Sequence, residues 1–262
     1  SLSIRLSLPA LIEEPGKVLV DSVLFSDIVR KLPDESITLE TKEDTLFLIC
    51  GRSRYRLTMM DEENFPMIPR VEDGKKILME QKEFSKMVRM TNFAVGSDET
   101  RPILTGSLVE VKGNTMKMVS VDGFTIAIKT SPILEGEDCS VVIPGKSLNE
   151  VQKILSSGED TLEILVSSNH VVFSFNEIEI TSKVLEGNYI NYERVIDTSF
   201  NTEVEIPITP FYEALDRVSL LANKSKSYIV NFDFEEREME MSSNSELGLA
   251  KESIEVINHG AP

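Results

Sequence analysis

The sequence reads Arg54-Tyr55-Arg56-Leu57-Thr58 at one point and Ile178-Glu179-Ile180-Thr181-Ser182 about 124 residues later. Each of these similar stretches runs on to a similar turn, Asn64-Phe65-Pro66 in the first copy and Asn188-Tyr189-Ile190 in the second. A short helical pattern precedes each copy. Similarity at a fixed period indicates one structural unit that is used several times. We therefore expect the function to belong to the repeated array rather than to one catalytic pocket.

A second similarity, at an offset of about 128 residues, relates two helical patterns. The corresponding positions are Phe84, Met87, Arg89, Met90 and Ala94 in the first pattern and Tyr212, Leu215, Arg217, Val218 and Ala222 in the second. In all, four helices are predicted, over residues 22–32, 82–95, 146–157 and 210–226. Their apolar residues recur with helical spacing, which predicts that one side of each helix packs on a sheet. These stripes include Phe84, Met87, Val88 and Thr91, then Leu148, Val151, Ile154 and Leu155. Thr209 and Pro210 are expected to begin the last helix as N-cap and first-turn proline.

Alternating strands dominate the middle of the chain. Strands are expected over residues 107–112, 115–121 and 124–130, separated by Gly113-Asn114 and Asp122-Gly123, which are two-residue hairpin signals. A second three-stranded meander is expected over 161–166, 171–175 and 178–184. A helix precedes each meander and a short strand precedes each helix. Residues from about 75 to 196 therefore predict an α+β domain with internal pseudo-symmetry, in which two helices pack on antiparallel sheets.

Three domains are expected in tandem. Residues 1–72 contain only the second half of such a unit, residues 73–200 a complete unit, and residues 201–262 the first part of a third. Both ends of the chain then fall inside domains, which suggests a piece of a longer protein. Because a half-domain leaves its apolar face uncovered, we expect that this chain alone does not form a stable closed assembly.

The composition is that of an ordinary globular protein. Apolar residues make up 41% of the 262 residues, and no apolar run approaches the roughly 20 residues of a membrane span. The N-terminus does not resemble a signal peptide. Cys50 and Cys139 are far apart and form no metal or redox motif. The simplest interpretation is a cytoplasmic protein with reduced thiols.

The net charge is −17, which taken alone argues against nucleic acid, because Lys and Arg supply phosphate affinity. The distribution of charge changes that conclusion, since each of the four predicted helices has a small net positive charge while the rest of the chain is acidic. This division has a plainer alternative, in which good helix formers simply lie on solvated helix faces.

Catalytic and metal-binding patterns are weak. Pro144-Gly145-Lys146-Ser147 resembles the tail of a phosphate-binding loop, but Ser140 stands where that loop needs its first glycine. A capping box from Ser147 to Glu150 explains the segment better. His170 and His259 are the only histidines, and their spacing suits neither a metal site nor a catalytic triad. We expect no catalytic residues, no metal and no cofactor.

Several runs resemble the bacterial DNA polymerase III β subunit, the sliding clamp. They are residues 98–106 (DETRPILTG), 121–127 (VDGFTIA), 185–195 (LEGNYINYERV), and 51–55 with 64–66 near the close of the first unit. The match is collinear over essentially the whole chain. The sequence departs from the family at Phe124-Thr125, where His-Arg is usual, and at Ile190, where Pro is common.

The resemblance implies the DNA-clamp fold and a replication function. In that family two subunits of three similar domains close head to tail into a ring around duplex DNA, with helices lining the hole. A non-catalytic processivity factor is implied, whose DNA-binding is topological and not sequence-specific. The residues implied to face DNA are Arg30, Lys31, Lys82, Lys86, Arg89, Lys146, Lys153, Arg217 and Lys224.

The resemblance also implies protein partners and a homodimer in the full-length protein. The replicative polymerase, the clamp loader and repair proteins bind through short linear peptides in an apolar pocket. The pocket residues carried over are Leu104, Gly123, Phe124, Thr125, Ile126, Ile190, Arg194 and Val195. The subunit interface carried over comprises Tyr55, Leu57, Leu220 and Leu221.

Two other functions compete with this one. An acidic repeat scaffold or DNA mimic would bind proteins only, and its basic residues would be scattered over several faces. An enzyme with an unfamiliar site would need a deep pocket with convergent polar groups.

Overall fold

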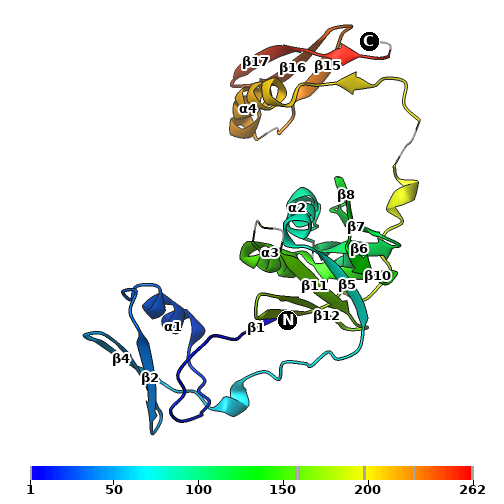
Figure 1. Ribbon diagram of the computed structural model, residues 1–262. Helices are drawn as coiled ribbons and strands as arrows, with labels where there is room; N and C mark the ends of the chain where they lie inside the picture. Colours follow the sequence, from blue (N-terminus) through cyan, green and yellow to red (C-terminus); the bar gives the residue numbers. More distant parts are fainter. Residues whose placement is uncertain are drawn as a thin grey trace. The chain divides into compact units, whose positions relative to one another are not determined.

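The computed structural model describes residues 2–98, 100–156, 158, 160–196, 199–226 and 228–260 (Figure 1). The chain divides into two compact units, Ser1–Ile190 and Asn191–Pro262. Each unit is described by itself.

The middle of the first unit contains the same succession of elements twice. The first half comprises β5 (Lys75–Glu80), α2 (Gln81–Thr91), β6 (Gly106–Lys112), β7 (Thr115–Val121) and β8 (Ile126–Pro132). The second half comprises β10 (Cys139–Pro144), α3 (Gly145–Ile154), β11 (Thr161–Val166), β12 (His170–Phe175) and β13 (Ile178–Lys183). The predicted order of strand, helix and three strands, repeated twice, is confirmed.

The two halves exchange their opening strands. β5 pairs antiparallel with β11 of the other half, and β10 pairs antiparallel with β6. The resulting sheets have the orders β1-β13-β12-β11-β5-β9 and β10-β6-β7-β8, where β1 is Leu2–Leu6 and β9 is Glu135–Gly136. Because each sheet contains strands from both halves, the halves fold as one domain.

The helix α2 buries the stripe that its spacing predicts. Phe84, Met87, Val88 and Thr91 are all fully buried, and the Phe84 ring lies 5.5 Å from that of Phe173 on β12. On α3 the prediction is confirmed for Leu148 and Val151 but wrong for Ile154, which is exposed. The helix ends at Ile154, and the extended backbone of Leu155 turns that residue toward the core instead.

The predicted capping box at Ser147 is wrong. The helix α3 begins two residues earlier, at Gly145, and Pro144 occupies the N-cap position without a side-chain bond. Ser147 is therefore inside the first turn, where its buried hydroxyl accepts a 2.7 Å hydrogen bond from Ser182. Glu150 instead forms an ion pair with Lys153.

Residues before β5 form a smaller helix and sheet. The helix α1 (Ser22–Val29) is followed by an antiparallel sheet of β2 (Ile37–Lys42), β3 (Thr45–Cys50) and β4 (Ser53–Thr58). An isolated bridge joins Leu19 to Met60, in the place that the bridge between Val142 and Leu185 occupies in the second half of the central motif. The repeat seen in the sequence is therefore also a repeat of backbone pairing.

The strand β1 was not predicted. It pairs with β13 over its whole length, from Leu2 opposite Ser182 to Leu6 opposite Ile178. It thus extends a sheet of the central motif, across the boundary expected near residue 72.

The second unit contains one long helix on one sheet. The helix α4 (Ile208–Ser225) packs on β15 (Asn231–Phe234), β16 (Glu238–Ser245) and β17 (Gly248–Glu255), while β14 (Val204–Glu205) pairs with β18 (Ile257–Asn258). The core cluster of this unit comprises Ala214, Val218, Met239, Met241 and Val256. The predicted N-cap at Thr209 is wrong, because the helix begins at Ile208 after Pro207.

Short 3-10 helices join several of these elements. They are η1 (Glu62–Asn64), η2 (Asn92–Ala94), η3 (Pro102–Thr105) and η4 (Tyr192–Arg194).

Candidate DNA-facing and partner-binding surfaces

The helices α2 and α3 lie side by side (Figure 1). At the end of α2, the Asn92 side-chain amide donates to the Gly145 carbonyl at 3.0 Å and to the Asn149 side chain at 2.7 Å. This contact ties the end of one helix to the start of the other. It holds the two helices of the central motif in a fixed relation.

The basic residues of these helices lie outside the buried stripes. Lys82, Arg89, Lys146 and Lys153 are exposed, and Lys86 is half-buried. Lys153 forms a 2.7 Å ion pair with Glu150. An exposed ion pair of this kind contributes little to stability, but it offsets one positive charge on α3.

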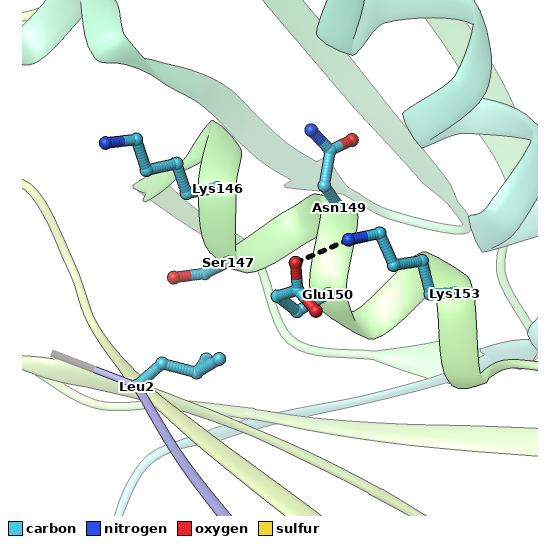
Figure 2. A pocket seen from close by; sticks show the side chains of 6 residues that line it. All are labelled: Leu2, Lys146, Ser147, Asn149, Glu150 and Lys153. Carbon is cyan, nitrogen blue, oxygen red and sulfur yellow. Dashed lines mark hydrogen bonds and ion pairs between the residues drawn. The ribbon is translucent and has the colours of Figure 1, made fainter. Parts of the chain in front are cut away.

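A hollow of about 250 Å³ lies beside α3 (Figure 2). Its lining residues are Leu2, Lys146, Ser147, Asn149, Glu150 and Lys153. Figure 2 shows Leu2, from β1, across the hollow from the helix. Because β1 is paired with β13, one lining residue of this hollow comes from a strand far from α3 in the sequence.

The remaining residues expected to face DNA come from other parts of the chain. Arg30 and Lys31 are exposed directly after α1, and Lys224 is exposed in the last turn of α4. Arg217, on α4, donates two hydrogen bonds of 2.8 Å to the carboxylate of Glu252 on β17. Sequence reasoning missed this partner, because nothing local relates residues 217 and 252.

The segment that carries Phe124 is a four-residue turn. The predicted two-residue hairpin at Asp122-Gly123 is wrong, because Val121 pairs with Ile126 and leaves residues 122–125 outside the ladder. One carboxylate oxygen of Asp122 accepts from the backbone N–H of Phe124 at 2.8 Å and of Thr125 at 2.7 Å. The N–H groups of Thr125 and Phe124 hold the pKa of Asp122 below its usual range. Gly123 has a φ of +100°, which an L side chain rarely adopts.

Two of the expected pocket residues differ sharply in exposure. The Phe124 side chain is 99% exposed at the tip of this turn, whereas Leu104, on η3, is only 7% exposed. Ile126 begins β8 and is half-buried. The turn therefore presents an aromatic ring to solvent beside a well-packed segment.

Tyr189 anchors the segment that carries Ile190. Its hydroxyl lies 3.3 Å from the carbonyl oxygens of Gly106 and of Val119, to which it can donate. Burial raises the pKa of Tyr189 to about 12, so the phenol stays protonated at neutral pH. Ile190 follows directly and is 42% exposed. Sequence reasoning quoted Tyr189 within a motif but gave it no role, although an aromatic residue directly before a pocket residue was an available signal.

Arg194 and Val195 belong to the second unit, in and directly after η4, and both are exposed. The other six pocket residues all lie in the first unit.

The expected interface residues lie on β4 and α4. Tyr55 is exposed, but Leu57 is only 5% exposed and packs with the buried residues of its own sheet. On α4, Leu220 is exposed and Leu221 is half-buried. Both β4 and β17 are outermost in their sheets.

Within the described ranges, no group of three or more His, Cys, Asp or Glu side chains is placed to hold a metal ion. Both cysteines are free thiols, with Cys50 buried and Cys139 half-buried. No helix in the described part of the chain is long and apolar enough to cross a bilayer.

Repeated halves of strand, helix and three strands, with paired helices on antiparallel sheets, define a protein of the α+β clamp class. Family models cover nearly the whole chain: DNA polymerase III beta subunit, N-terminal domain (residues 1–69), central domain (78–191) and C-terminal domain (193–262). The chain therefore belongs to the DNA polymerase III beta subunit family, whose members are sliding clamps and non-catalytic subunits of that polymerase.

Individual relatives agree with this assignment. The chain is 32% identical over 247 residues to the beta sliding clamp of Staphylococcus aureus (strain Mu50 / ATCC 700699), which covers 93% of this chain and 66% of that protein. The beta sliding clamp of Staphylococcus epidermidis is 33% identical over 246 residues, covering 93% and 65%. The crystal structure of the DNA polymerase sliding clamp from Bacillus subtilis superposes with a TM-score of 0.93 at 29% identity, covering 99% of this chain and 72% of that one. The chain thus spans about two thirds of the length of its curated relatives.

Proposed function

We propose that the full-length protein is a sliding clamp that encircles duplex DNA and tethers the replicative polymerase to it in the cytoplasm. The family membership of all three segments carries this proposal. Two side-by-side helices that keep their apolar stripes inward and their lysines and arginines outward support it. A modest positive charge suits a clamp, because tight phosphate contacts would hinder sliding.

The β1–β13 pair supports the proposed closure of a ring. It is an example, within one chain, of a strand from the segment matched to the N-terminal domain that continues a sheet of the central domain. We propose that β4 of one full-length subunit and β17 of the next continue a sheet in the same way. Tyr55 and Leu220 would then be exposed contacts of that homodimer interface, and Leu57 and Leu221 would lie next to them on β4 and α4.

The proposed peptide pocket is apolar and binds partner proteins. Leu104, the turn 122–125, Ile126 and Ile190 would form its walls in the first unit. The occupants would be short linear peptides of the polymerase, the clamp loader and repair proteins.

Retention on DNA tests the clamp function. In the full-length protein, Lys82→Glu, Lys86→Glu and Arg89→Glu together should shorten the residence time on nicked circular DNA after loading. A matched control reverses three strand lysines, Lys42, Lys112 and Lys129, and therefore changes net charge equally. Equal loss of retention in both triple variants would show that only total charge matters, and would contradict a DNA-facing role for α2.

A further inference from the structure

Arg101 lies between the two walls of the proposed pocket that come from η3 and from the turn 122–125. Its backbone carbonyl accepts a 3.0 Å hydrogen bond from Leu104, and it is the N-cap residue of η3. Its guanidinium lies beside the turn, since a Cβ on Gly123 would be 3.7 Å from both terminal nitrogens of Arg101. One residue thus hydrogen-bonds to one wall and lies close to the other.

Asp98 fixes Arg101 at two points. Arg101 Nε donates to one Asp98 carboxylate oxygen at 3.3 Å, and the Arg101 backbone N–H donates to the Asp98 carbonyl at 3.2 Å. The other carboxylate oxygen accepts from the Thr100 hydroxyl at 2.6 Å and from its N–H at 2.9 Å. The direction of the Arg101 side chain is therefore set by a hydrogen-bonded loop and not by solvent alone.

The turn beside Arg101 has little packing of its own. Phe124 is 99% exposed, so its ring is not held by a core. Gly123 has the most permissive backbone of any residue type. The two bonds accepted by Asp122 fix the shape of the turn, but they do not fix its position relative to η3.

We propose that Arg101 is a positioning residue, which holds the turn 122–125 against η3 and so sets where Phe124 stands relative to Leu104. A planar guanidinium that is held at Nε by Asp98 can place both terminal nitrogens beside Gly123, a geometry that a lysine ammonium cannot reproduce. A pre-ordered turn binds a peptide at a lower entropic cost than a mobile one. The effect on peptides rests on the proposed pocket, whereas the effect on the turn does not.

The chain contains no tryptophan, so Phe124→Trp gives a single fluorescent reporter at the tip of the turn. In that background, time-resolved anisotropy would compare the parent with Arg101→Gln and Arg101→Lys. The control is Arg5→Gln, because Arg5 also forms an exposed ion pair, with Glu179 at 3.2 Å. We expect a larger fast depolarisation in both Arg101 variants and no change in the control.

Binding of a fluorescein-labelled peptide from the replicative polymerase is measured on the same proteins. Affinity should fall roughly threefold to tenfold in both Arg101 variants. Unchanged anisotropy in Arg101→Gln would overturn the proposal even if peptide affinity fell, because Arg101 would then act by direct contact. If the parent bound no peptide while the anisotropy changed as expected, the positioning role would stand and the pocket function would fail. If Arg101→Gln did not fold, Asp98→Asn would supply the same test by removing the anchor's charge.

Discussion

The guanidinium of Arg217 donates two hydrogen bonds, each of 2.8 Å, to the carboxylate of Glu252, which joins α4 to β17. The shared bonds raise the pKa of Arg217 and lower that of Glu252, so both groups stay charged and offset each other. One of the cations expected to face DNA is therefore neutralised by a residue on the neighbouring strand.

Glu252→Gln should release that cation. In the full-length clamp, non-specific DNA affinity at low salt should rise, and the slope of log affinity against log salt should steepen by up to about one. The measurement is a salt titration of DNA binding. The double variant Arg217→Gln, Glu252→Gln serves as the control and should change little, since it removes a pair that contributes almost no net charge. A slope that stays the same in Glu252→Gln would mean that Arg217 does not face DNA.

Phe84→Ala should destabilise the central motif strongly. The ring is fully buried against Phe173, and such truncations cost about 3–5 kcal/mol. Hydrogen exchange of the α2 amides in denaturant measures this loss of stability. Lys82→Ala, on the exposed side of the same helix, should cost less than about 0.5 kcal/mol. Comparable losses in both variants would contradict the assigned buried face.

Ser107 and Ser120 face each other on β6 and β7, with hydroxyl oxygens 2.7 Å apart and both side chains buried. Ser120→Ala should cost about 1–3 kcal/mol, because it leaves the Ser107 hydroxyl buried without its partner. The double variant Ser107→Ala, Ser120→Ala should cost less than the two single variants summed. The free energy of unfolding is measured in denaturant for the parent, the two single variants and the double variant. Simple additivity of the losses would show that the two hydroxyls do not interact.

The turn that carries Phe124 should loosen in acid. Hydrogen bonding lowers the pKa of Asp122 in the folded state. The stability that the ionised carboxylate gives to the turn is therefore fully present above the unfolded-state pKa of about 3.9, and it is lost as the pH falls through the lower folded-state pKa. The amide NMR shifts of Phe124 and Thr125 should therefore move below about pH 4. Asp122→Asn should remove that movement. The pKa of Asp98 is also lowered, by Thr100 and Arg101, and the Thr100 amide reports that titration separately. Movement that persists in Asp122→Asn would assign the acid transition to another group.

Much of the site could be placed on its elements from the sequence. The lysines of α2 and α3 lie outside the buried stripes as predicted, because the side of a helix is fixed by spacing within a few residues. The partner of Arg217, the anchor provided by Tyr189 and the position of Arg101 could not be predicted. Each depends on a contact between segments that only the folded chain brings together.

The sequence by itself determined the two meanders, the helix stripes and the repeat, since periods of two and 3.6 residues and a recurring pattern are properties of neighbouring positions. The tertiary structure alone decided that β5 and β10 exchange sheets, that β1 joins β13, and that Ser147 lies buried against Ser182 instead of capping α3. Strand partners are selected by how whole faces pack, and a burial pattern along one strand does not state which edge it will meet. For the same reason the four-residue turn at Asp122 followed from the register of β7 with β8, which no local turn signal fixes.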